Sequence, residues 1–253
     1  MALRLHSTGR GAFRDLPMKL SRPLPHAALV AFALLSYSAH AEEIPAQSSP
    51  RNAAAERLTR ATNTLQEFRK NATGVTRKLF DSAHCILVAP RRLADETSMG
   101  APGFVTCRSA SGGGWTKPAA VEVADGGVVW WVIGAQMDLV ILAENPGAAA
   151  ALQSRNVMFG VDPVVQPGPV TEDQVRSQPA SAPLLFSYEQ SSDGIKGIQL
   201  AGATLSEEPD ANAALYGKRL STSDVFTLKA GNTKPAALSP FLAALPSASR
   251  EGM

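Results

Sequence analysis

The spacing of hydrophobic and polar residues changes near position 84. Before it, Leu58, Ala61, Leu65 and Phe68 recur at intervals of three and four residues, the spacing of one helix face. This pattern predicts a helix that Asn52 caps and that ends at about Lys70. After position 84, short apolar runs alternate with glycine, proline and polar residues, which is typical of strands and turns.

These patterns predict the elements of an α+β fold. We expect strands at residues 85–89, 103–107, 119–123, 128–133, 139–142, 184–188, 197–200 and 203–205, with loops at 91–102 and 163–169. We expect further helices at residues 76–83, 146–153, 207–216, 221–226 and 236–245. Short strands in the middle of a chain with helices on either side indicate a mostly antiparallel sheet, or a barrel-like core, bracketed by N-terminal and C-terminal helices.

The first 41 residues have the pattern of a secretory leader. A basic stretch precedes an apolar run from Ala27 to Leu35, and Ala39-His40-Ala41 is a small-x-small cleavage pattern. Either Met1 or Met18 can serve as the start. We therefore expect a periplasmic or secreted protein. Its organisation would be a leader (1–41), a linker (42–50), one domain (51–246) and a tail (247–253).

Removal of this leader changes the charge of the chain. The whole sequence has a formal net charge of +2, but residues 42–253 carry 19 basic and 21 acidic side chains, a net charge of −2. This charge argues against general nucleic-acid binding, which needs clustered lysine and arginine. His84 is the single histidine beyond the leader, so zinc sites with several histidines are excluded. We expect neither a metal nor a cofactor.

The chain has two cysteines, Cys85 and Cys107, each in a predicted strand. An even number of cysteines in an exported chain favours a disulfide. The alternative is a pair of buried free thiols.

Candidate catalytic and ligand-binding residues are few. His84 and Cys85 are adjacent, and adjacent side chains of a strand point to opposite faces, so they would not form a catalytic pair. Glu207, Glu208 and Asp210 lack the spacing of a calcium loop and suit the start of a helix. Asp138 is either a buried side chain bonded to backbone amides or a turn residue.

Three tryptophans, at positions 115, 130 and 131, lie within 17 residues. The last two are adjacent, so they face opposite sides of the predicted strand. Both could belong to the core, or one could reach a groove or a membrane interface.

Several segments, in this order, resemble the SYLF domain family over about residues 53–228. They are Lys78–Ala83, Cys85–Pro90, Gly103–Val105 with Arg108, Gly114–Ala119, Asp138–Leu142, Gly160–Asp162, Ser187–Tyr188, Leu200–Ala203 and Asn212–Gly217. Two segments depart from the family pattern. Residues 91–99 are polar where the family has glycines, and residues 128–132 are large and apolar where it has small residues.

The resemblance implies lipid binding, because the first, basic helix of eukaryotic relatives is associated with membrane contact. The corresponding segment here is 52–78, and we expect its residues Arg69, Lys70, Arg77 and Lys78 to bind anionic lipid head groups. The apolar stripe of this helix either packs on the sheet or inserts into a membrane. Eukaryotic members also associate with actin, a partner that we do not expect in a bacterial envelope.

We therefore expect an exported, non-enzymatic SYLF-type domain that binds lipid head groups or a membrane surface. The alternative is a structural or interaction protein of the cell envelope without lipid specificity. An enzyme that depends on His84 is the third possibility.

Overall fold

The computed structural model describes residues 49–93, 100–110, 112, 114–124, 137–160, 165–179, 182, 184–228 and 235–247. All of them belong to one compact unit, Ala46–Met253. The predicted leader, the tail beyond Ser247 and the predicted strand at 128–133, with Trp130 and Trp131, lie outside the described residues.

In the described part of the chain, the centre of this unit is a nine-stranded sheet in the order β5-β9-β3-β2-β1-β4-β7-β6, with β8 also paired to β7. Its strands are β1 (Cys85–Ala89), β2 (Ala101–Cys107), β3 (Ala119–Ala124), β4 (Asp138–Ala143), β5 (Asn156–Met158), β6 (Val165–Pro167), β7 (Leu185–Ser191), β8 (Gly194–Gly197) and β9 (Thr204–Glu207). Every pair is antiparallel except β6 with β7. The prediction of an α+β fold with a mostly antiparallel sheet is confirmed.

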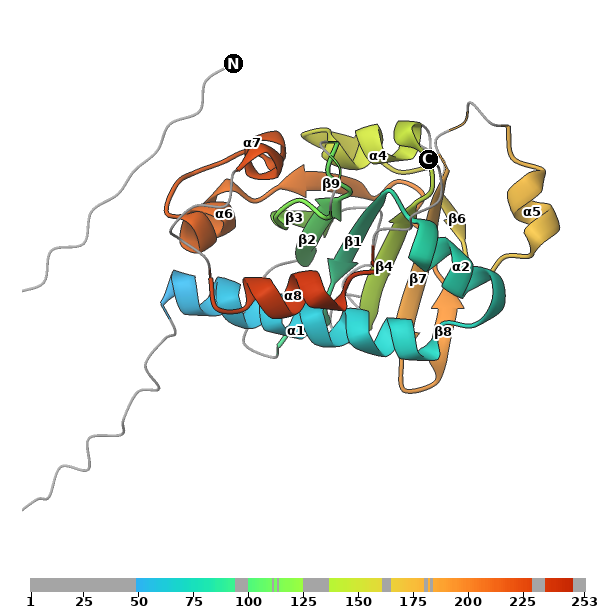
Figure 1. Cartoon of the computed structure of the whole chain (residues 1–253), viewed down its shortest axis with the longest axis horizontal. Coiled ribbons are helices and arrows are strands. Elements are labelled where there is room, and N and C mark those ends of the chain that lie inside the picture. Colours follow the sequence, from blue (N-terminus) through green and yellow to red (C-terminus); the bar gives the residue numbers. More distant parts are fainter. Residues whose placement is uncertain are drawn as a thin grey trace, which may run out of the picture. The chain divides into compact units, whose positions relative to one another are not determined.

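Helices cover the middle of this sheet (Figure 1). The helices of the described residues are α1 (Pro50–Asn71), α2 (Gly74–Ser82), α4 (Pro146–Gln153), α5 (Glu172–Arg176), α6 (Pro209–Tyr216), α7 (Thr222–Thr227) and α8 (Leu238–Ala244), of which α5 lies apart at the periphery. Helix α1 contacts β1 and β2, α8 lies beside α1, and α4 contacts β1 and β4. Strands β1 and β4 are buried at every position, because other elements cover both of their faces.

Local signals in the sequence set several helix ends. Asn145 caps α4 by accepting a hydrogen bond from the backbone N–H of Ala148 (2.8 Å), and Pro146 follows it, as predicted. Helix α6 ends at Gly217, whose φ of 77° is the left-handed conformation expected there. The predicted cap Asn52 was wrong: Ser49 caps α1 and Pro50 begins it, inside the predicted linker.

Other predictions failed where pairing with distant segments forms the element. Residues 165–167 were expected in a loop, yet they form β6 against β7. We expected a strand at residues 197–200, but β8 comprises Gly194–Gly197. Pairing of these residues with the end of β7 sets its position. Strand β5 and helix α5 were not predicted, since segments of three and five residues carry too little periodicity to be recognised.

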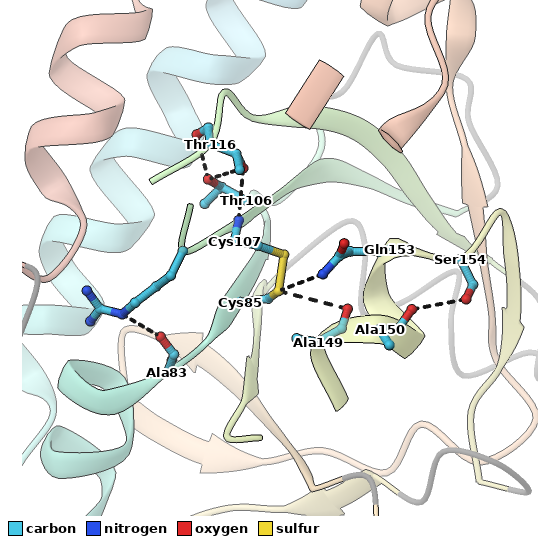
Figure 2. Close-up of a disulfide and its surroundings, with 10 residues drawn as sticks. Ala83, Cys85, Thr106, Cys107, Thr116, Ala149, Ala150, Gln153 and Ser154 are labelled. Carbon is cyan, nitrogen blue, oxygen red and sulfur yellow. Dashed lines mark hydrogen bonds between the residues drawn. A yellow bond between two sulfur atoms is a disulfide. The ribbon is translucent and has the colours of Figure 1, made fainter. Parts of the chain in front are cut away.

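Cys85 and Cys107 form a disulfide, which confirms the predicted bridge. The two residues are directly opposite each other in the β1–β2 ladder, and both are buried. Figure 2 shows that Thr116 lies beside them: its hydroxyl accepts a hydrogen bond from the backbone N–H of Cys107 (3.1 Å), and its carbonyl accepts one from the hydroxyl of Thr106 (2.8 Å).

Candidate functional site

The apolar stripe of α1 packs on the sheet. Leu58, Leu65 and Phe68 are fully buried, and the Phe68 ring lies 5.5 Å from that of Phe80 and 5.4 Å from that of Tyr188. Burial of large side chains of this kind contributes roughly 1.5–3 kcal/mol each to stability. The stripe is therefore part of the core in this structure, whereas Arg69 and Lys70 near the end of α1 are exposed.

The four residues predicted to bind lipid gather where α1 ends and α2 begins. Arg69 and Lys70 are exposed in the last turn of α1, where positive charge interacts favourably with the helix dipole. Arg77 and Lys78 follow in α2. We call these four residues the basic junction.

Within the basic junction, the side chain of Arg77 joins α1 to α2. One of its guanidinium nitrogens donates a hydrogen bond to the carbonyl of Arg69 (2.7 Å), at the end of α1, and its Nε pairs with Asp81 (2.9 Å). A basic side chain near the start of α2 opposes the dipole of that helix. The bond to the end of α1 and the ion pair within α2 explain why an arginine is accommodated there.

The other three residues of the basic junction differ in their partners. Lys78 forms an exposed ion pair with Glu172 of α5 (2.5 Å). Among the described residues, neither Arg69 nor Lys70 has a carboxylate within ion-pair distance. These two cations are therefore accessible to an anionic partner.

Arg69 also borders a groove of about 510 Å³. We call it the α1–α8 groove, and its lining residues are Arg69, Gly114, Trp115, Leu242, Ala243, Leu245, Pro246 and Ser247. The chain pattern did not predict this groove, because its walls come from three distant segments. Trp115 was recognised only as one of three clustered tryptophans.

Hydrogen bonds hold one wall of this groove. The indole N–H of Trp115 donates to the carbonyl of Pro246 (2.8 Å), and the guanidinium of Arg108 lies 4.7 Å from the centre of the indole ring. Arg108 also donates to the carbonyls of Asp81 (2.8 Å) and Ser247 (3.3 Å). It thus connects the end of α2 to the segment that follows α8.

Glu144 lies near Arg108, just after β4. Burial raises the pKa of its carboxyl to about 8, although a hydrogen bond from the Ser82 hydroxyl (2.9 Å) and the charge of Arg108 favour the ionised form. No local pattern indicated this group, because its surroundings come from distant segments that carry Ser82 and Arg108.

Asp138 is a buried side chain bonded to a backbone amide, which was the first of its two predicted roles. Its carboxylate accepts a hydrogen bond from the backbone N–H of Arg91 (2.8 Å), and burial raises its pKa. It lies in a polar pocket of about 200 Å³ that also includes Arg60 and Glu67 of α1. The bond to Arg91 fixes the chain at the end of β1.

The comparisons with known proteins agree with the resemblance. Residues 125–248 match the family model described as Ysc84, Las17-binding protein actin regulator. The chain contains a SYLF domain. A search of curated proteins found no match. The matched range includes α8 and the residues of the groove that follow it, whereas the basic junction and both cysteines precede it.

The remaining candidate catalytic and ligand-binding residues do not form a common site. Glu207 accepts a hydrogen bond from the backbone N–H of Thr222 (2.7 Å), Glu208 pairs with Arg57 (2.5 Å) and Asp210 pairs with Arg219, so the three carboxylates have separate partners. His84 is exposed whereas Cys85 is buried, as expected for adjacent positions.

Within the described ranges, no three His, Cys, Asp or Glu side chains are close enough together to hold a metal ion. The same ranges contain no helix that is long and apolar enough to cross a membrane.

Proposed function

We propose that this SYLF domain is a non-enzymatic module that binds the surface of anionic membranes through the basic junction. The observation that carries the proposal is the exposure of Arg69 and Lys70 without an acidic partner among the described residues. Arg77 and Lys78 add positive charge beside them, which their partners Asp81 and Glu172 partly compensate.

The buried stripe of α1 supports binding at the surface of the membrane rather than insertion of this helix. Each basic residue close to an anionic surface contributes about 1 kcal/mol, and the attraction decreases as salt screens it. Arg69 and Lys70 would then supply roughly 2 kcal/mol. We therefore expect weak binding that depends strongly on ionic strength.

The printed description of the family names an actin regulator. We do not carry this partner over to the present chain, because we propose that the leader directs the protein to the periplasm or outside the cell. Lipid is a partner available in that compartment.

Sedimentation with phosphatidylglycerol-containing vesicles tests the proposal. We expect the parent protein to co-sediment at low salt and to be released at high salt. The Arg69→Ala/Lys70→Ala variant should bind several-fold more weakly, and the additional changes Arg77→Ala and Lys78→Ala should reduce binding further.

A matched control removes two charges away from the basic junction, one at the start of α1 and one just after α6. Arg51 and Lys218 are exposed, and Arg51 lies about 27 Å along the helix from Arg69 at 1.5 Å per residue. Arg51→Ala/Lys218→Ala should bind like the parent. No binding by the parent at low salt would favour the alternative, an envelope interaction protein without lipid specificity. Equal loss in both double variants would show that net charge, not the basic junction, is responsible.

A further inference from the structure

Among its described lining residues, the α1–α8 groove combines apolar side chains with one cation, Arg69. Leu242 of α8 and Leu245 and Pro246, which follow α8, contribute apolar lining, and Trp115 joins them through the hydrogen bond from its indole N–H to the carbonyl of Pro246. The volume of about 510 Å³ is within the range of roughly 300–1,000 Å³ that is common for small-molecule sites.

The groove is preformed by contacts within the domain. Besides the bond from Trp115 to Pro246, Arg108 reaches both the indole ring and the carbonyl of Ser247. Leu245 is nearly fully buried, so this part of the lining is anchored in the core. A ligand would therefore meet an ordered wall and would not need to create it.

The charges of the groove select the kind of ligand. Arg69 is its charged lining residue, and the described residues that line it include no aspartate or glutamate. Apolar side chains beside an exposed guanidinium suit a molecule with a hydrocarbon chain and an anionic head. The guanidinium can donate two parallel hydrogen bonds to a phosphate or carboxylate.

We propose that the α1–α8 groove binds one acyl chain of an anionic lipid, with the head group at Arg69. The proposal rests on the proposed membrane function and extends it: Arg69 belongs to both the basic junction and the groove, whereas Lys70 belongs to the basic junction and does not line the groove. One lipid molecule would thus be held at the edge of the surface that contacts the membrane.

The test uses monomeric lysophosphatidylglycerol below its critical micelle concentration, with bromine atoms on the acyl chain. The chain has three tryptophans, so the Trp130→Phe/Trp131→Phe variant leaves Trp115 as the fluorescent reporter. We expect saturable quenching of Trp115. Isothermal titration calorimetry on the unmodified protein should give the same affinity, which makes the test independent of how the double variant folds.

Ala243 offers a variant that should not disturb folding, because it is exposed while lining the groove. Ala243→Glu places a carboxylate beside the lipid and should weaken binding of the monomeric probe at least tenfold, with Ala243→Gln as the uncharged control of similar size. Arg69→Ala should also weaken it, whereas Lys70→Ala should leave it unchanged and reduce vesicle binding alone.

Two results would overturn the proposal. Absence of saturable binding by the parent, with vesicle binding intact, would reject the groove as a lipid site while leaving the basic junction in place. If only a protein truncated after Ser247 bound the probe, residues 248–253 would be the natural occupant of the groove. If the protein bound the monomeric lipid probe but not the vesicles, the proposed membrane function would be rejected and the groove would remain a lipid site.

Discussion

Reduction of the Cys85–Cys107 disulfide should destabilise the domain by about 3 kcal/mol. The bridge joins positions separated by 22 residues. In the chain-entropy model, a closed loop of this length restricts the unfolded chain by roughly 11 cal/mol/K, which corresponds to about 3 kcal/mol at 25 °C. Both sulfur atoms are buried in the core between β1 and β2, so the reduced protein gains no new solvation that would offset this loss.

Guanidinium denaturation with and without dithiothreitol measures the effect. For a domain of about 200 residues, a loss of 3 kcal/mol also lowers the melting temperature by roughly 6–12 °C, which a thermal scan would detect. The matched control is Cys85→Ala/Cys107→Ala, whose stability should not respond to reductant. Thiol titration of the protein as isolated, unfolded in denaturant without reductant, should find no free thiol.

Three outcomes would contradict this reasoning. Two free thiols in native protein would show that the bridge does not form in its compartment. An equal loss of stability on reduction in the parent and in the double alanine variant would show that the reductant acts elsewhere. A loss well below 1 kcal/mol in the parent alone would mean that the reduced chain already restricts this loop, for example through residual β1–β2 pairing in the unfolded state.

Two further predictions concern Glu144 and the leader. Because burial raises the pKa of Glu144 from 4.5 to about 8, the folded state holds a proton that the unfolded state releases, and the free energy of unfolding should fall as pH rises between these values. In urea denaturation, Glu144→Gln should reduce the fall in the free energy of unfolding between pH 5 and pH 8 by about 1 kcal/mol or more. The same pH dependence in both proteins would contradict a raised pKa of Glu144. The leader pattern predicts that the mature protein begins at Glu42, and N-terminal sequencing of native protein that still starts at Met1 or Met18 would exclude cleavage there.

The sequence by itself determined the elements whose signals are local. Strand β1 was predicted with its observed ends, and α4 with its cap at Asn145, because an apolar run closed by proline and an Asn-Pro pair act on their immediate neighbours. The pairing of the cysteines could also be anticipated, since only two are present and each was placed in a strand. The order of the family segments then indicated the SYLF domain.

Only the tertiary structure decided which surface is free. The spacing of Leu58, Leu65 and Phe68 is the same for a helix that packs on a sheet and for one that enters a membrane, so burial against Phe80 and Tyr188 was needed to decide between them. The four basic side chains looked equivalent in sequence, yet Arg77 binds the end of α1 and Lys78 pairs with α5.

For the same reason, the sequence alone could not predict the α1–α8 groove. Its walls come from positions 69, 114–115 and 242–247, and nothing in a local pattern records that these segments meet. Periodicity and capping act over a few neighbouring residues, whereas a groove and the partners of a surface charge depend on contacts between residues far apart in the chain.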